Sequence, residues 1–176
     1  MKLKSGRSIK YILMALVVAA LIILAIFLRN QSMIKQLPST DLTSLSIEGI
    51  VPDRNIDEVD LTRFSKSSQF EDRVKKKLSY TYYEDFLLVT DRSGKIVQVQ
   101  TLTDKGIASV LGGRLSTLTD VEHELGTHYI VKSYNREQGL NSRTYYDKQH
   151  GLRARFVYAK TGESPHKVIW LILEKY

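Results

Sequence analysis

An uninterrupted apolar segment near the N-terminus constrains this chain more than any other feature. Tyr11 to Leu28 is a run of 18 uncharged, mostly aliphatic residues. As a helix it would be about 27 Å long, close to the hydrocarbon thickness of a bilayer. The backbone of such a helix bonds within itself, and no polar face interrupts the run. We therefore predict a transmembrane anchor over residues 11–28, with Tyr11, Leu16, Leu21 and Leu28 among its residues.

The charges around this run predict its orientation. Five of the 26 Lys and Arg residues lie in the first 30 positions, where there is no acidic residue. The other 21 stand against 19 Asp and Glu, so the formal net charge of +7 becomes +2 over the rest of the chain. Because basic residues gather on the cytoplasmic side, we predict a cytoplasmic basic tail over residues 1–10 and an extracytoplasmic C-terminal part.

A cleaved signal peptide is the competing interpretation of the run. It would need a shorter apolar core followed by small residues, whereas this run ends in Ile26-Phe27-Leu28-Arg29. We therefore expect an uncleaved anchor in a cell membrane. Residues 29–46 are rich in Ser, Thr and Gln and contain Pro38, which predicts a stalk holding the outer domain off the bilayer.

Composition excludes several classes of function. The chain has no cysteine, which rules out a disulfide framework, an Fe–S cluster, a thiolate zinc site and a cysteine nucleophile. A net charge of +2 over the outer part does not supply the strong basic field of a nucleic-acid-binding surface. We therefore expect no nucleic-acid partner.

The first half of the outer part, residues 47–105, predicts one helix and several strands. Asn55 is expected to cap a short helix that ends near Leu61 to Phe64. Residues 65–77 are compatible with a helix or with an irregular strand. Alternation then predicts strands over Leu78–Tyr83, Phe86–Thr90 and Lys95–Leu102, with Ile96, Gln98 and Gln100 sharing one face of the last.

The second half, residues 106–176, repeats this plan. Thr117 to Asp120 is a capping box, and Gly126 is a natural C-terminal stop for the helix that follows it. Four strand-like runs come next: His128–Tyr134, Arg143–Lys148, Leu152–Tyr158 and Lys167–Leu173.

The two halves correspond in several places. Each has a short helix, then Tyr-rich strands, then a final strand that begins Lys95-Ile96-Val97 or Lys167-Val168-Ile169. We predict an α+β fold: an N-terminal transmembrane helix, then tandem helix and antiparallel-meander units forming an extracytoplasmic domain. The units are expected to share one antiparallel sheet with helices on one face.

The second half also resembles a known family. The segment from Leu118 to Gly126 is similar to the "x-x-D-V-x-x-x-L-G" helix of beta-lactamase-inhibitor-protein-like domains, a superfamily that includes small outer-membrane assembly lipoproteins. The likeness continues through Tyr145-Tyr146-Asp147, Gly151 to Phe156 and Val168 to Leu173, over about 65 residues. It implies a helical pair against an antiparallel sheet, often in tandem, that binds proteins. It implies no shared catalytic residues.

Two patterns come close to catalytic or metal chemistry. His123 and His128 approach the H-E-x-x-H motif of zinc proteases, but their spacing is i+5, and Gly126 is expected to end the helix between them. Glu84 and Asp85 are neighbours, and neighbouring strand residues point to opposite faces, which counts against an acid–base pair. We predict no catalytic residues, no metal site and no cofactor.

Tyrosines lie on or beside strands of both halves, and arginines lie among the later strands: Tyr80, Tyr82, Tyr83, Tyr129, Tyr134, Tyr145, Tyr146 and Tyr158, with Arg143, Arg153 and Arg155. Both residue types are enriched at binding hot spots because they combine apolar area with directional polar groups. Packing of a half-buried sheet also favours tyrosine and is the competing interpretation for each of these tyrosines. We predict a binding surface that includes Arg143, Tyr145, Tyr146, Arg153, Arg155 and Tyr158.

These observations favour a non-catalytic module that recognises another envelope protein or peptide, with the bilayer as a second partner through the anchor. Self-association into a homo-oligomer is compatible with the same surface. Two alternatives are a regulator or enzyme acting on cell-wall material and a structural subunit of a transmembrane assembly.

Overall fold

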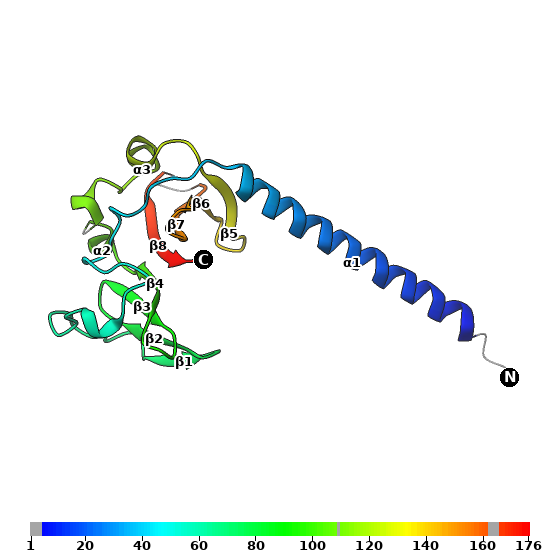
Figure 1. The fold of residues 1–176 in the computed structure, drawn as a ribbon, viewed down its shortest axis with the longest axis horizontal. Helices are drawn as coiled ribbons and strands as arrows, with labels where there is room; N and C mark the ends of the chain where they lie inside the picture. The colour runs from blue at the N-terminus through cyan, green and yellow to red at the C-terminus, as the bar shows by residue number, and fades with distance from the viewer. Residues whose placement is uncertain (1–4, 109, 162–165) are drawn as a thin grey trace. The chain divides into compact units, whose positions relative to one another are not determined.

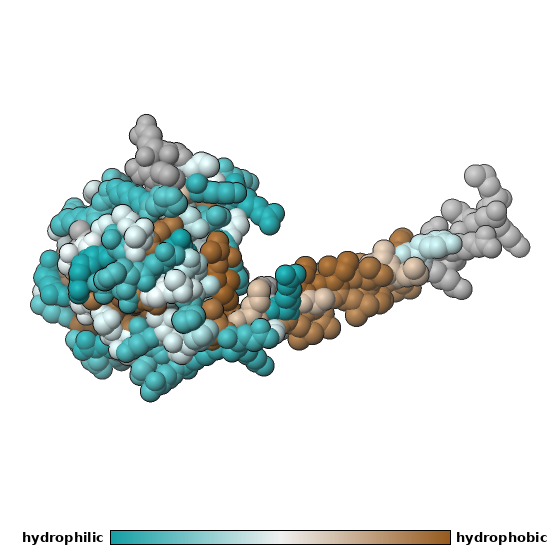
Figure 2. All heavy atoms as spheres, turned by 90° about the horizontal axis from the view of Figure 1, so that it is seen from above, coloured by the Kyte–Doolittle hydropathy of each residue, from teal (hydrophilic) through white to brown (hydrophobic). Residues whose placement is uncertain are grey.

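The computed structural model describes residues 5–108, 110–161 and 166–176, and it divides into two compact units. The first unit, Met1–Pro38, contains the helix α1 (Ser5–Gln36). By its length and composition α1 is able to cross a membrane. Figure 2 shows it brown along most of its length, whereas the second unit has a mainly hydrophilic surface in this view.

The second unit, Ser39–Tyr176, is built on one antiparallel sheet of eight strands (Figure 1). The α+β fold class is therefore confirmed. The strands are β1 (Arg73–Lys75), β2 (Leu78–Tyr82), β3 (Phe86–Thr90), β4 (Ile96–Thr101), β5 (Ile130–Asn135), β6 (Leu140–Asp147), β7 (Leu152–Ala159) and β8 (Val168–Lys175). All seven strands expected from alternation or turn residues are present with small shifts at their ends; β1 is the additional one.

The strand order is symmetrical about the centre of the sheet. It runs β1-β2-β3-β4-β8-β7-β6-β5, so each half of the chain contributes a four-stranded meander, and the last strands of the two meanders pair. The central pair of this junction is Val99 and Leu173, with Gln98 opposite Glu174 on one side and Gln100 opposite Ile172 on the other. Gln100 and Ile172 are 72 positions apart, as are Lys95 and Lys167.

Each half also connects its helix to its last strand in the same way. Asn55, the N-cap of the 3-10 helix η1 (Ile56–Glu58), forms an isolated bridge with Lys95. Thr117, the N-cap of the helix α3 (Leu118–Leu125), forms the same bridge with Lys167.

The two last strands also carry matching irregularities. The register shifts between β3 and β4 just after Lys95, and between β7 and β8 just after Lys167. A β-bulge moves the following residues to the other face. Ile96 therefore shares a face with Val99, whereas Gln98 and Gln100 lie on the opposite one, which corrects the expected alternation of this strand.

Helices and the N-terminal segment of this unit cover one face of the sheet. The main core joins strand residues such as Leu88, Phe156 and Leu171 to Leu118 and Val121 of α3. The helix α2 (Asp104–Ala108) and the 3-10 turn η2 (Val110–Gly113) contribute to the same core. Figure 1 shows α2 and α3 outside the curve formed by β5 to β8.

The N-terminus of α3 is formed as the sequence predicts. The side chains of Thr117 and Asp120 exchange hydrogen bonds with each other's backbone N–H groups, which is the reciprocal capping box. Gly126 ends the helix with a φ of 77°, a value that favours glycine.

The expected stalk over residues 29–46 is wrong in two respects. Residues 29–36 continue α1 by about two turns. Leu42 and Leu45 are fully buried in the main core of the second unit, where the N–H of Leu42 donates to the carboxylate of Asp147. Because the segment is polar in composition, the sequence does not indicate that two of its leucines pack against residues about 100 positions away.

In the first half one further expectation needs correction, and one alternative that the sequence left open is decided. The helix after Asn55 is only one 3-10 turn, because Val59 already has an extended backbone. Residues 65–77 form no helix: Ser67 accepts hydrogen bonds from the N–H groups of Gln69 and Phe70, and a strand begins only at Arg73.

Removal of the Leu42 side chain tests whether residues 39–46 belong to the folded unit. Leu42→Ala should lower the free energy of unfolding by about 2–5 kcal/mol, because it empties a fully buried site. Urea unfolding followed by the fluorescence of Trp170 measures this. Val74→Ala is the control, since Val74 is 75% exposed and should change stability by less than about 1 kcal/mol. Equal effects of the two changes would contradict the burial of Leu42.

Candidate functional site

No described helix of the second unit packs on the second face of the sheet. Side chains alternate along a strand, and directly paired residues of neighbouring strands share a face. We call the face that carries Glu174 the open face, meaning the strand side chains on the same side as Glu174. Its two small apolar clusters consist of strand residues and Leu102 alone, among the residues that the structure describes.

The centre of the open face consists of two rows of paired residues. One row runs Gln98, Glu174, Arg153 and Tyr146, and the next runs Gln100, Ile172, Arg155 and Thr144. Both rows cross the junction between β4 and β8, so residues from both halves of the chain meet here.

The open face is concave over the second half. β5 and β8 are three strands apart, which corresponds to about 14 Å in a flat sheet. The ring centroids of Tyr134 on β5 and Trp170 on β8 are nevertheless 6.0 Å apart, and Arg155 of β7 lies 6.0 Å from the Tyr134 ring. Figure 1 shows the corresponding curl of β5 to β8. Tyr134 and Trp170 thus line the inside of the curve.

The predicted Tyr and Arg residues divide between the two faces. Tyr146, Arg153 and Arg155 lie on the open face, whereas Arg143, Tyr145 and Tyr158 lie on the helix-covered face. Tyr145 and Tyr146 are only 0% and 2% exposed. The prediction that these two tyrosines contact a partner is therefore corrected: their rings pack inside the domain.

Arg143 and Tyr145 hold α3 against the sheet. Arg143 lies 2.7 Å from the carboxylate of Glu122 and donates to the carbonyl of Leu118. The Tyr145 hydroxyl donates to the carbonyl of Gly126, and burial raises the pKa of Tyr145 far above its usual range. Tyr129 donates to the same Glu122 carboxylate, and this hydrogen bond raises the pKa of Tyr129. These contacts give Arg143 and Tyr145 a structural role.

Arg153 and Arg155 share a single carboxylate on the open face. Their Nε atoms lie 3.0 Å and 2.7 Å from the same oxygen, Oε1 of Glu174. The Arg153 contact is a hydrogen bond, whereas the angle at Arg155 Nε is unsuitable for one. Burial is the largest influence on Arg153 and lowers its pKa, but the Glu174 carboxylate and the Tyr146 hydroxyl raise it overall. The cluster therefore holds two cations against one anion.

A second aromatic and basic group lies at the other end of the sheet. Arg73 is positioned over the rings of Tyr80 and Tyr82, at 5.3 Å and 5.8 Å, and Phe70 stacks on Tyr82. Phe70, Arg73 and Trp170 were not among the candidate binding residues, whereas Tyr80, Tyr82 and Tyr134 belong to the wider set of strand tyrosines. Strand alternation combined with the strand order would have placed Tyr80 and Tyr82 on the side of Arg155, but the order is not visible in the sequence.

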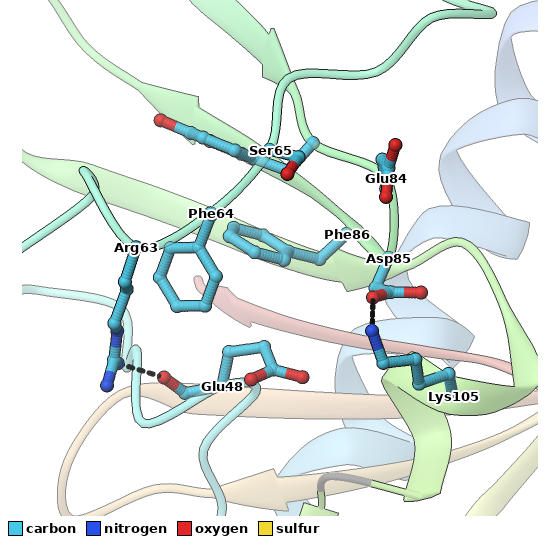
Figure 3. A pocket seen from close by; sticks show the side chains of 9 residues that line it. Glu48, Arg63, Phe64, Ser65, Glu84, Asp85, Phe86 and Lys105 are labelled. Carbon is cyan, nitrogen blue, oxygen red and sulfur yellow. Dashed lines mark hydrogen bonds and ion pairs between the residues drawn. The ribbon is translucent and has the colours of Figure 1, made fainter.

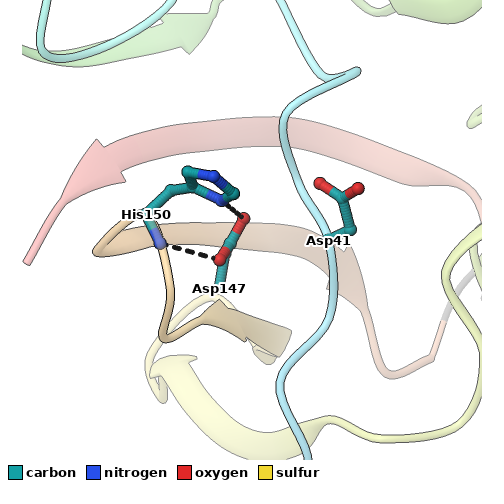
Figure 4. A group of neighbouring side chains, drawn as sticks. All are labelled: Asp41, Asp147 and His150. Carbon is teal, nitrogen blue, oxygen red and sulfur yellow. Dashed lines mark hydrogen bonds and ion pairs between the residues drawn. The ribbon is translucent and has the colours of Figure 1, made fainter.

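A group of possible metal ligands lies at the turn between β6 and β7. Asp41, Asp147 and His150 have ligand atoms within 4.8 Å of one another (Figure 4). Asp147 already accepts from the N–H groups of Leu42, Gln149 and His150 and bonds the His150 ring at 2.9 Å. Asp41 accepts from Thr43. Fastening residues 41–43 to the turn explains this cluster without an ion, although its oxygen and nitrogen atoms are of the kinds that divalent metals accept.

A polar pocket lies at the turn between β2 and β3 (Figure 3). Glu84 and Asp85 form this turn, because the N–H of Tyr83 donates to the carbonyl of Phe86. They therefore line the same pocket and do not point to opposite faces of a strand, as the sequence suggested. Asp85 is held by Lys105 at 2.9 Å and by the hydroxyl of Thr103, so it is not a free base.

The two histidines of the remaining near-motif do not lie on one helix, because α3 ends at Leu125. His123 is exposed on α3 and His128 is exposed beyond the end of that helix, as the i+5 spacing predicts. Comparison of the chain with family models, with curated proteins and with solved structures finds no match.

Asp147 makes the stability of the second unit depend on pH. Burial is the largest influence and raises its pKa, but the hydrogen bonds from His150 and Leu42 lower it overall below the ordinary 3.8. The ionised carboxylate therefore contributes stability that is present above pH 3.8 and is lost as the pH falls through the folded pKa.

Asp147→Asn tests this dependence. The variant should be less stable than the parent at neutral pH, and the difference should shrink as the pH falls below 3.8. Urea unfolding across this pH range measures it, with the exposed Asp57→Asn as the control. A difference that stays constant with pH would contradict the assignment.

Proposed function

We propose that this protein is a membrane-anchored, extracytoplasmic and non-catalytic module that binds another envelope protein or peptide through the open face. The observation that carries the proposal is a concave sheet face that no described helix of the second unit covers, lined by Tyr134, Trp170 and two arginines. Tyr, Trp and Arg are the residue types that dominate binding hot spots. Concave surfaces also let an inserted group lose most of its contact with water.

Partly exposed aromatic rings support the same proposal. Tyr134 is 37% exposed, and Trp170 and Arg155 are half-buried beside it. A side chain in this state is already restricted by its neighbours, so little conformational entropy is lost when a partner covers it.

We also propose that the second unit consists of two tandem α+β units, 47–105 and 106–176, similar to the beta-lactamase-inhibitor-protein-like domains. The symmetrical strand order, the matching Asn55–Lys95 and Thr117–Lys167 bridges and the matching bulges support a duplication. A local sequence accident would not reproduce a helix cap, a bridge and a bulge at corresponding positions.

The proposed location is a cell membrane, with the N-terminus cytoplasmic. It is supported by the apolar side chains exposed along α1 and by the basic residues that precede them. Alkaline phosphatase fused after Tyr176 should be active, because this enzyme requires an extracytoplasmic environment, whereas a cytoplasmic reporter at the same place should be silent. Replacing Lys2, Lys4, Arg7 and Lys10 by Glu should reduce the phosphatase signal. A strong cytoplasmic reporter signal in the parent would overturn the orientation.

Photo-crosslinking tests the binding face. Benzoylphenylalanine at Tyr134 in the full chain should give a discrete protein adduct in the native membrane, and Trp170→Ala should reduce its yield several-fold. Benzoylphenylalanine at the exposed His123 of α3 is the control and should give little adduct. An adduct only from position 123 would move the interface to the helices. An adduct with twice the mass of the chain would replace the envelope partner by a second copy.

A further inference from the structure

Charge on the open face differs from charge elsewhere in the outer part. The strand register places five basic residues on this face and one acidic residue, Glu174; the basic ones are Arg73, Lys75, Lys132, Arg153 and Arg155. Over the whole outer part the sequence has 21 basic and 19 acidic residues, which leaves 16 against 18 away from these strand positions. The open face is therefore positive although the rest is slightly negative.

The positive charge is incompletely compensated at the centre of the concave region. Glu174 offers one oxygen to both Arg153 and Arg155, and the buried Nε of Arg155 makes no hydrogen bond of suitable geometry within the described residues. The side chain of Arg155 is only 28% exposed and lies near the Tyr134 ring. The guanidinium of Arg155 is partly desolvated and shares its counter-ion with Arg153, which favours the binding of an incoming anion.

We propose that the open face selects an acidic segment of its partner, and that Arg155, assisted by Arg153, receives a carboxylate of that segment. The inference rests on the proposed binding function of this face. Arg155 pairs with the carboxylate in the geometry that guanidinium and carboxylate groups favour, and Tyr134 and Trp170 enclose the apolar stem of the same residue. Glu174 holds the two arginines in place before binding.

The shape of the face favours a protein segment over an anionic bilayer surface. A flat layer of lipid headgroups does not enter the curve in which Tyr134, Trp170 and Arg155 meet, whereas a loop or an extended chain does. Arg73 and Lys132 lie farther out on the same face, where they attract acidic residues on either side of the bound carboxylate.

Selection from a random peptide library on the full chain in phosphatidylcholine nanodiscs tests the proposal, with empty nanodiscs as counter-selection. Enriched peptides should be rich in Asp and Glu, and their binding should weaken as salt concentration rises. Arg155→Gln should weaken the binding of an enriched peptide about tenfold or more, and Arg155→Lys less. Arg114→Gln is the matched control, because Arg114 pairs with Glu124 on the helix-covered side.

A second variant keeps the test informative if Arg155→Gln does not fold. Glu174→Gln removes the internal negative charge but keeps a side-chain oxygen that accepts from Arg153, so it should strengthen binding of the acidic peptide several-fold. Peptides that crosslink to position 134 but lack acidic residues would overturn the acidic selection and leave the proposed function intact. Peptides that crosslink only to position 123 would overturn the proposed function itself. The full chain could instead bind phosphatidylglycerol vesicles as tightly as the acidic peptide and lose this binding in Arg155→Gln. That result would assign the face to lipid headgroups and overturn the choice of partner.

Discussion

The pairing of β4 with β8 is the contact on which the rest of the second unit depends. It joins two meanders that are otherwise separate in the strand order, and it extends over only three residue pairs. The N–H of Leu171 adds a hydrogen bond to the hydroxyl of Thr101 beside them. On the covered side this junction brings Val99 and Leu173 into one core, and on the open side it places Glu174 between Gln98 and Arg153. The same few pairs thus determine both the core and the charge cluster.

Local patterns were sufficient to predict the strands and the cap of α3. A capping box, a glycine stop and period-two alternation are each contained within about ten residues, so their physical basis is present in the sequence. The short 3-10 turn after Asn55 marks the limit of this reasoning. A two-turn helix is marginal by itself, and whether it extends is decided by packing against distant residues.

Faces were harder to predict than strands. The bulge after Lys95 reverses the direction of every following side chain in β4, and no residue in the sequence announces it. Tyr145 and Tyr146 are neighbours on β6, and both lie beside the arginines of β7. Nevertheless Tyr145 packs under α3, and Tyr146 lies on the open side. The burial of Leu42 likewise depends on Asp147, 105 positions away. Such information becomes available only when the strand order is known.

The proposed membrane anchoring lowers the affinity that the proposed interface needs. Two proteins held in one membrane meet at a high effective concentration, so a small hot spot with moderate affinity is sufficient. Under these conditions discrimination matters more than strength, and charge is an efficient means of discrimination because an uncompensated like charge is strongly disfavoured. In the cluster of Arg153, Arg155 and Glu174, one internal carboxylate reduces the repulsion between the two arginines. In the proposed function the residual positive charge disfavours basic partners. The net charge of the chain, by contrast, is concentrated at the N-terminus and says more about membrane orientation than about recognition.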